Sequence, residues 1–239
     1  MQVVILAGGL GTRLSEETDL IPKPMVRIGD LPILSHIMNY YSKYGHKDFI
    51  IALGYKSEVI TEYFQSQSAR ELHHDISIKL IDTGLETSTG GRIKLLEKLL
   101  ETEFLLTYGD GLSNVNIDLL QAHHKRFGKI ATVTAVRPPA RFGTIEISNG
   151  IVTKFAEKDP QDAGWINGGF FCLNKKVCTF IHNEAISFES EPLNHLVAIN
   201  ELSAFAHDGW WQPMDTLRDK RALETLWQKG EAPWLVTQS

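Results

Sequence analysis

Residues 2–25 read QVVILAGGLGTRLSEETDLIPKPM and join a short apolar run to a glycine-rich segment. The run QVVIL (2–6) is typical of a buried strand. Gly8, Gly9 and Gly11 follow at once, and glycines let backbone N–H groups approach an anion with no Cβ in the way. Phosphate is therefore the leading ligand for this loop. The alternative is that the glycines only form a tight turn that needs a positive φ. Three glycines followed by Thr-Arg make that alternative less favoured than phosphate binding.

Two common phosphate-binding motifs do not fit this loop. The Rossmann motif needs a glycine three residues after Gly11, where this chain has Leu14, and Walker A needs a closing Gly-Lys-Ser/Thr that the sequence lacks. The loop instead returns with Lys23, whose flanking prolines restrict where the ammonium points. Arg13 offers a planar fork for phosphate oxygens and Lys23 a compact charge. We therefore expect a triphosphate held from two sides, with a solvated surface lysine as the alternative for Lys23.

Strand-like and helix-like segments alternate through the first half of the chain, which is typical of a mostly parallel sheet with helices on its faces. After 2–6, further strands are expected in DFIIALGY (48–55), at 76–82, in FLLTYGDG (104–111) and at 129–136. Helices are expected at 31–44, 56–64 and 92–101, and from the N-cap candidate Asn116 through Arg126. The predicted fold class is α/β, with a mostly parallel mixed sheet flanked by helices.

The second half has shorter strands separated by Gly, Asn and Pro turns, namely GTIEI (143–147), IVTKFAE (151–157) and NGGFFCL (167–173). We expect them to form a small antiparallel extension of the sheet, with helices near 174–182 and 189–198. A last helix is predicted to begin at Thr216, with Asp219 at its third position. Because the sequence has no repeat or flexible linker, we expect one domain over 1–239, whose halves are about 1–128 and about 129–239.

Composition narrows the class of protein. The chain has 239 residues, 43% of them hydrophobic and 22% charged, with a formal net charge of -5 at pH 7. This balance argues against a protein that coats nucleic acid or anionic membranes, since such binding neutralises many phosphates. The sequence opens on a strand-like segment and has no run near the ~20 apolar residues of a membrane span. We expect a cytoplasmic protein that binds neither nucleic acid nor membranes.

Other reactive residue types give weak signals. Cys172 and Cys178 lie in apolar surroundings without CxxC spacing, so two buried thiols are expected rather than a redox or zinc site. The neighbouring pairs His73-His74 and His123-His124 have no metal-binding spacing, and we expect these four histidines at the surface. The sequence also has no GxSxG motif, which makes a hydrolase a less favoured class for this protein.

Two aspartates are candidates for a metal site. Asp110 in LLTYGDG follows a predicted strand, and ligands of open α/β sheets bind outside the carboxyl ends of the strands. Asp215 in WWQPMDT lies just ahead of the predicted last helix. Mg²⁺ prefers one or two carboxylates together with substrate phosphates, so the two residues make chemical sense as a pair if the fold brings them together. The alternatives are a turn or helix cap for Asp110 and a helix cap for Asp215.

The motif LAGGLGTRLSEET…PKPM (6–25) is similar to the signature of the sugar nucleotidyltransferases. Later motifs narrow the resemblance to the family members that join CTP to glucose 1-phosphate: TGGR (89–92), YGDG (108–111), RFG (141–143), INGGFF (166–171), EPL (191–193) and WWQPMDTLRDK (210–220). The resemblance covers nearly the whole chain. It implies a Rossmann-like nucleotide-diphospho-sugar transferase fold. It also implies a reaction of CTP with α-D-glucose 1-phosphate that gives CDP-glucose and pyrophosphate with Mg²⁺ present.

The resemblance also implies roles for individual residues. Three would act in catalysis: Arg13, Lys23 and Asp110. The nucleotide would be held by Leu6, Ala7, Gly8, Gly9, Gly11, Thr12, Arg13, Lys23, Thr87, Arg92 and Gly109. The sugar phosphate would be held, mainly by the second half, at Gly143, Glu157, Lys158 and Asn167. The metal ligands would be Asp110 and Asp215.

The chemistry of these residue types agrees with such a transfer. A phosphate oxygen of the sugar phosphate attacks the α-phosphorus in line, and positioning with charge neutralisation supplies most of the catalysis, so no protein nucleophile is needed. Arg13 and Lys23 would stabilise the leaving pyrophosphate. Arg92 could donate to the acceptors of the cytosine base, while backbone carbonyls near Gly8 accept from the amino group of the base.

Two other functions stay open at this point. One is the same class of enzyme with another nucleotide or another acceptor phosphate. The other is a noncatalytic sugar-nucleotide sensor, which would have less use for a pair of metal ligands. We also expect a homo-oligomer.

Overall fold

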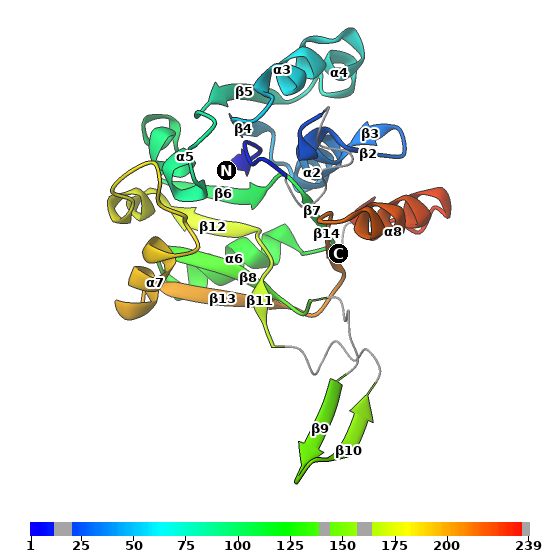
Figure 1. Cartoon of the computed structure of the whole chain (residues 1–239). Coiled ribbons are helices and arrows are strands. Elements are labelled where there is room, and N and C mark those ends of the chain that lie inside the picture. The colour runs from blue at the N-terminus through cyan, green and yellow to red at the C-terminus, as the bar shows by residue number, and fades with distance from the viewer. Residues whose placement is uncertain (12–20, 139–143, 157–163, 236–239) are drawn as a thin grey trace.

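The computed structural model describes residues 1–11, 21–138, 144–156 and 164–235. Within these residues an eight-stranded sheet forms the centre of the molecule, and helices cover both of its faces (Figure 1). Strand β1 (Gln2–Leu6) lies in the middle and is buried along its whole length. Its alternate side chains enter two cores. Val3 and Ile5 lie on the face covered by α2 (Ile33–Lys43) and α6 (Ile117–Phe127). Val4 and Leu6 lie on the face covered by α5 (Thr89–Leu95) and α7 (Glu191–Ala198). The predicted α/β class is confirmed.

The parallel part of the sheet holds four strands of the first half of the chain, in the order β5 (Ser77–Asp82), β4 (Asp48–Leu53), β1 and β6 (Glu103–Tyr108). Leu6 at the end of β1 pairs with Ala52 on one side and with Tyr108 on the other. The carboxyl ends of these strands therefore meet at one edge, as the alternation of strands and helices predicts.

The second half of the chain extends the sheet beyond β6. Strand β12 (Phe171–Asn174) is antiparallel to both β6 and β8 (Ala131–Val136), as expected for an antiparallel extension. The short β11 (Ile166–Asn167) pairs with the far end of β8. An additional strand, β13 (Leu202–His207), runs parallel to β8 and was not predicted.

Most helices lie where the sequence predicts them: α2 (Ile33–Lys43), α3 (Ser57–Gln65), α6 (Ile117–Phe127), α7 (Glu191–Ala198) and α8 (Leu217–Gln228). The side chain of Asn116 accepts from the Leu119 N–H and caps α6. Thr216 and Asp219 form a reciprocal capping box at α8. Both predicted caps are confirmed. The structure adds α4 (Gln67–Leu72) after α3.

Two helix predictions need correction. The segment expected as a helix at 92–101 forms α5 (Thr89–Leu95) and then the 3-10 turn η3 (Glu97–Leu99). The helix begins earlier because Gly90 and Gly91 let it pack directly against the backbone of residues 184–186. A Cβ at Gly90 would lie 2.6 Å from the Ile186 carbonyl oxygen, and a Cβ at Gly91 would lie 2.2 Å from the Glu184 carbonyl oxygen. The segment near 174–182 is the 3-10 helix η5 (Lys175–Phe180). Two further 3-10 turns are η2 (Lys23–Met25) and η6 (Pro233–Leu235).

Three two-stranded ribbons complete the described structure. Strands β2 (Arg27–Ile28) and β3 (Leu31–Pro32) form one, and β7 (Gly111–Ser113) with β14 (Trp211–Pro213) forms another. The third, β9 (Thr144–Ser148) and β10 (Ile151–Ala156), stands apart from the main sheet at the bottom of Figure 1. The expectation that these two strands extend the main sheet is therefore wrong, because among the described strands they pair only with each other. None of the helices in the described ranges is long and apolar enough to span a membrane.

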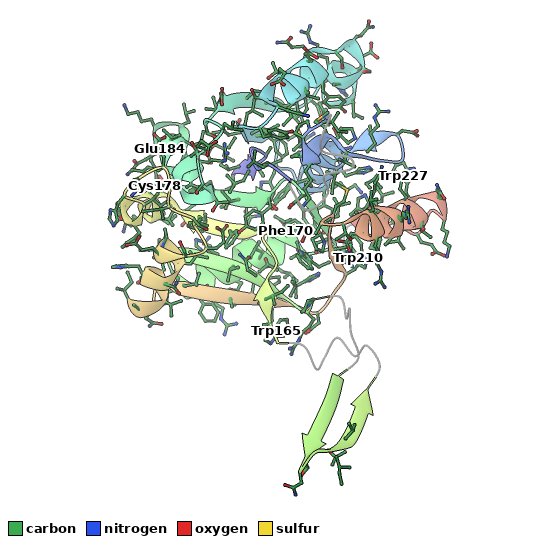
Figure 2. The ribbon with its side chains drawn as sticks, in the orientation of Figure 1. Trp165, Phe170, Cys178, Glu184, Trp210 and Trp227 are labelled. Atoms are coloured by element: carbon green, nitrogen blue, oxygen red, sulfur yellow. The ribbon has the colours of Figure 1, made fainter. Side chains whose placement is uncertain are left out.

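The expectations for cysteine and histidine have different outcomes. Cys172 and Cys178 are buried free thiols, as predicted (Cys178 is labelled in Figure 2), and burial raises their pKa values to about 12 and about 11. The expectation of surface histidines is wrong for His73 and His124, which are 5% and 3% exposed. Adjacent residues point in different directions, in α6 for His123-His124 and in the turn after α4 for His73-His74, so one member of each pair turns inward. There it bonds a buried hydroxyl, Ser35 for His73 and Thr132 for His124.

Candidate active site

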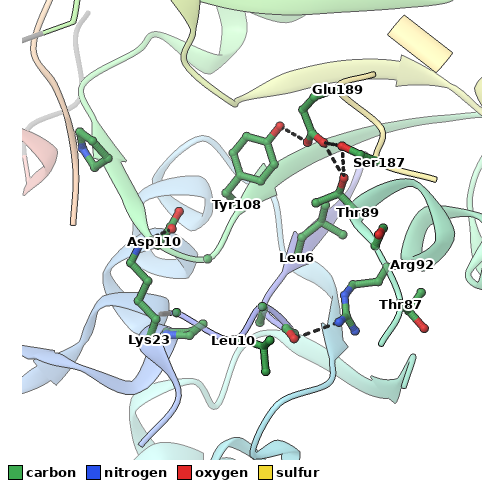
Figure 3. Close-up of a pocket in the computed structure, with 18 of the residues that line it drawn as sticks. Leu6, Leu10, Lys23, Thr87, Thr89, Arg92, Tyr108, Asp110, Ser187 and Glu189 are labelled. Atoms are coloured by element: carbon green, nitrogen blue, oxygen red, sulfur yellow. Dashed lines mark hydrogen bonds and ion pairs between the residues drawn. The ribbon is translucent and has the colours of Figure 1, made fainter. Parts of the chain in front are cut away.

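A cavity of about 720 Å³ opens at the carboxyl ends of β1 and β6 (Figure 3). Its walls come from five parts of the chain: the glycine-rich loop after β1, Lys23 with Pro24, residues 85–89 before and at the start of α5, residues 108–110 after β6, and second-half residues including Asn167, Glu189 and Asp215. The site thus combines both halves of the sequence. This is the edge of an open α/β sheet where ligands bind.

The two candidate metal ligands lie side by side in this cavity. Asp110 comes directly before β7 and Asp215 shortly after β14, and these two strands pair antiparallel, with Gly111 opposite Pro213. The Met214 N–H also donates to the Asp110 carbonyl at 2.8 Å. The condition for treating the two aspartates as a pair is therefore met. Thr216 caps α8, so the alternative of a helix cap for Asp215 is excluded.

Lys23 joins the two carboxylates. Its Nζ donates to Asp110 Oδ2 at 2.6 Å and to Asp215 Oδ1 at 2.7 Å. Lys23 follows Pro22 in extended conformation, begins the turn η2 with Pro24, and is only 6% exposed. The alternative of a solvated surface lysine is excluded. One positive charge faces two negative ones, so these three side chains form a locally acidic site that already holds a cationic group.

Arg92 is engaged by the protein itself. Its Nη1 donates to the Leu53 carbonyl, the Thr83 hydroxyl and the Gly84 carbonyl at 2.8, 2.6 and 2.8 Å, and its Nη2 donates to the Gly8 carbonyl at 2.9 Å. The guanidinium thus ties the loops that follow β1, β4 and β5 together. Burial lowers the pKa of this side chain, and the nearby Asp82 opposes that effect.

The glycines around Arg92 explain part of the glycine-rich loop. A Cβ at Gly8 would lie 2.2 Å from Arg92 Nη1, and a Cβ at Gly54 would lie 2.5 Å from the same atom. Nothing lies within 4 Å of a Cβ at Gly9. Gly11 has a φ of +66°, so the alternative of a turn that needs positive φ holds at this position. Two of the loop glycines therefore have a structural reason, the close approach of Arg92 at Gly8 and the positive φ at Gly11.

A second polar cluster lines the same cavity next to the start of α5 (Figure 3). The Glu189 carboxylate accepts from Tyr108 Oη at 2.5 Å, from Thr89 Oγ1 at 2.5 Å and from Ser187 Oγ at 2.6 Å. Asn167 Nδ2 donates to Tyr108 Oη at 3.2 Å. Sequence reasoning missed all of these residues except Asn167. The only signal was that Thr89 and Tyr108 begin the motifs TGGR and YGDG, and that Ser187 and Glu189 lie shortly before EPL.

The structure gathers most of the predicted site residues. The described ones all line this cavity: Leu6, Ala7, Gly8, Gly9, Gly11, Lys23, Thr87, Arg92, Gly109, Asp110, Asn167 and Asp215. Five others lie outside the described residues: Thr12, Arg13, Gly143, Glu157 and Lys158.

An open, mostly parallel sheet with a lysine and paired aspartates in a cavity at the carboxyl ends of its strands defines an α/β enzyme for phosphate-bearing ligands. Residues 2–214 match the family described as nucleotidyl transferase. The chain therefore belongs to the nucleotidyl transferase family.

Relatives match the chain over its full length. It is 50% identical to glucose-1-phosphate cytidylyltransferase of Salmonella typhi, with 98% of each chain covered. It is 40% identical to the probable glucose-1-phosphate cytidylyltransferase of Bacillus subtilis, with 99% of this chain and 100% of the relative covered. Among solved structures, HddC from Yersinia pseudotuberculosis is similar, with a TM-score of 0.74, 27% identity, and coverage of 95% of this chain and 99% of that one.

Proposed function

We propose that the protein transfers CMP from CTP to α-D-glucose 1-phosphate and so produces CDP-glucose and pyrophosphate. The observation that carries this proposal is the buried Lys23 between Asp110 and Asp215 in the cavity at the carboxyl ends of β1 and β6. The full-length relatives that bear the name of this activity support the choice of CTP and glucose 1-phosphate. No covalent intermediate with the protein is proposed, since in-line transfer needs positioning and charge neutralisation rather than a nucleophilic side chain.

The donor set of the site fits Mg²⁺. Asp110 and Asp215 would hold the ion, because paired carboxylates with substrate phosphates are what Mg²⁺ prefers, and their oxygens already surround a cationic group. When bound, Mg²⁺ would neutralise charge on the phosphates of both substrates. Lys23 would stabilise the leaving pyrophosphate, and the restricted backbone of the Pro22–Pro24 segment would limit the loss of entropy on binding.

The remaining residues divide between the two substrates in this proposal. The nucleotide would lie along the loop after β1 and against residues 87–92, with Thr12 and Arg13 contributing from the same loop. The sugar phosphate would lie toward Asn167, with contributions from Gly143, Glu157 and Lys158. This division follows the two halves of the chain, about 1–128 and about 129–239, with Asp215 as the contribution of the second half to the metal site.

The test is pyrophosphate release measured for each nucleoside triphosphate with a panel of sugar 1-phosphates. The expected result is turnover that needs Mg²⁺ and is fastest with CTP and glucose 1-phosphate. A preference for another pair would keep the class of enzyme and replace the substrates. Binding of nucleotides without turnover of any pair would favour a sugar-nucleotide sensor and contradict the proposal.

We also propose that the protein acts as a homo-oligomer. The ribbon β9–β10 stands apart from the main sheet (Figure 1), and its Ile151 and Val152 are 68% and 51% exposed. An isolated two-stranded ribbon is marginally stable in water, so apolar contact with a second copy of the chain would stabilise it.

A further inference from the structure

Glu189 is the common acceptor of three hydroxyl groups, two of them from distant parts of the chain. Tyr108 lies at the end of β6, Thr89 begins α5, and Ser187 belongs to the segment before α7. Oε1 of Glu189 accepts from Tyr108, and Oε2 accepts from both Thr89 and Ser187. All four residues line the proposed active-site cavity. Each hydroxyl donor loses rotational entropy when it is fixed on the half-buried carboxylate. This entropy loss suggests that the arrangement serves the cavity.

The cluster connects the two sides of the cavity. On one side, Tyr108 Oη accepts from Asn167, which is proposed to face the sugar phosphate. On the other side, Thr89 is part of the turn and helix that carry Thr87 and Arg92, and its Oγ1 also accepts from the Phe188 N–H at 2.9 Å. Glu189 is thus the one side chain of the described residues that bonds both Tyr108 and Thr89.

The negative charge of Glu189 fixes the direction of each hydrogen bond. A carboxylate can only accept, so the Tyr108 hydroxyl must donate to it and can only accept from Asn167. Burial and the Glu189 charge both raise the pKa of Tyr108, which keeps this donor protonated. The amide of Asn167 is oriented at its other end as well, because its Oδ1 accepts from the Gly169 N–H at 2.8 Å. The second N–H of the Asn167 amide thereby has a defined orientation and, within the described residues, remains available to a ligand.

A purely local structural role does not account for Glu189. The residue precedes α7, but Ser190 is the N-cap of that helix and makes no side-chain cap bond. Within the described residues, the Glu189 carboxylate accepts from hydroxyl groups and from none of the first N–H groups of α7. Its contacts therefore serve the cavity rather than the helix.

We propose that Glu189 is a positioning residue for nucleotidyl transfer, which orients Tyr108 and Asn167 on the acceptor side and anchors Thr89 on the nucleotide side. This inference rests on the proposed function. Through these contacts Glu189 holds the two substrate-binding sides in one geometry, so its loss acts on the alignment of the reacting groups. The residue itself does not touch the reacting atoms.

The test compares Glu189→Gln, Tyr108→Phe and the double variant, with Glu191→Gln as a matched control two residues away on the exposed start of α7. Glu189→Gln keeps the shape of the side chain and removes the charge. The expected effect of either single change is a ~10- to 100-fold lower kcat, with the KM for the nucleotide changed less than ~3-fold. If both residues act through one chain of contacts, the double variant loses no more than the more severe single variant. Glu191→Gln is expected to keep wild-type kinetics.

Three outcomes would overturn the inference: multiplicative losses in the double variant, a Glu189→Gln enzyme that matches Glu191→Gln, or a lower kcat that only tracks a lower melting temperature. If Glu189→Gln does not fold, Tyr108→Phe with unchanged kcat would overturn it as well. The series is run with the substrate pair that the wild-type enzyme prefers. A preference for a pair other than CTP and glucose 1-phosphate would therefore reject the proposed substrates while the Glu189 comparison still decides the positioning role.

Discussion

Lys23 has one charge to share between two carboxylates, and this imbalance governs the chemistry of the site. Asp110 is the more accessible partner, with a side chain 31% exposed, against 14% for Asp215. Removing one member of a buried, hydrogen-bonded ion pair leaves an uncompensated charge, which is costly. Here each aspartate can lose its neighbour and still keep Lys23. The site should therefore tolerate neutralisation of one aspartate in its folding but not in its proposed metal binding.

Asp110→Asn tests whether neutralisation of one aspartate leaves folding intact and impairs the proposed metal binding. We expect turnover to fall ~100-fold or more, since one of two proposed metal ligands loses its charge. The melting temperature should change little, because Lys23 keeps its 2.7 Å bond to Asp215. Pyrophosphate release and thermal unfolding followed by circular dichroism measure the two effects. Asp118→Asn, an exposed aspartate on α6, is the control. Unchanged activity of Asp110→Asn would remove this residue from the mechanism.

Gly8 and Gly9 offer a matched pair of substitutions. Gly8→Ala would place a Cβ 2.2 Å from Arg92 Nη1, whereas Gly9→Ala would place one with nothing within 4 Å. Overpacking of this kind costs about 1–3 kcal/mol, so we expect Gly8→Ala to lower the melting temperature by roughly 2–12 °C. Gly9→Ala should have the melting temperature of the wild type, so any effect of this substitution would be on the approach of a ligand to the loop. Equal melting temperatures for the two variants would mean that Arg92 moves away at little cost.

At the scale of elements, the site depends on contacts that local sequence does not encode. Asp110 could be placed after a strand and Asp215 before a helix, because strand ends and the capping box at Thr216 have local signatures. Their meeting depends on β7 and β14, strands of three residues each with no clear pattern. Glu189 lacks a signature too, since its partner Thr89 is 100 residues away. The pairing of the two aspartates could therefore be predicted only on the condition that the fold brings them together, and the Glu189 cluster was missed.

His73 makes the packing of α4 sensitive to pH. It lies at the end of α4, bonds Ser35 on α2 and contacts Phe64 on α3. Burial lowers its pKa to about 4, while Asp75 opposes that shift. The unfolded chain therefore takes up a proton at higher pH than the folded chain. The stability from neutral His73 is complete above the unfolded pKa of about 6.5 and is lost as the pH falls toward 4.

The expected contribution of His73 to the free energy of unfolding is at most on the order of 3 kcal/mol over this pH range. Urea unfolding between pH 7 and pH 4 measures it. His73→Gln should reduce the loss of stability on acidification, because glutamine does not titrate and can still bond Ser35. His74→Gln at the exposed neighbour is the control. A variant at position 73 with the same pH dependence as the wild type would contradict the prediction.

At the scale of the whole molecule, the two cores decide which parts of the fold the sequence predicts well. Strand β1 alternates between both cores and every parallel neighbour lies beside a helix of matching period, so the first half of the sheet could be predicted. The second half joins at one edge through β12, which pairs with β6, and β13 lies further out beside β8. The neighbours of both strands depend on long-range pairing. Periodicity specifies the face of a strand but not its partner. The parallel placement of β13 beside β8 was for this reason beyond sequence reasoning.

The ribbon β9–β10 carries the last prediction, because the rest of the described molecule gives it little cover (Figure 1). If Ile151 and Val152 pack against a second copy of the chain, multi-angle light scattering should give the wild type a mass that is a multiple of 26.9 kDa. The double variant Ile151→Ser/Val152→Ser should shift toward the monomer mass on dilution, since less apolar surface would be buried. Leu119→Ser, which changes an exposed leucine on α6, should leave the mass unchanged. A monomeric wild type would refute the oligomer, and an unchanged mass for the double variant would move the contact to another surface.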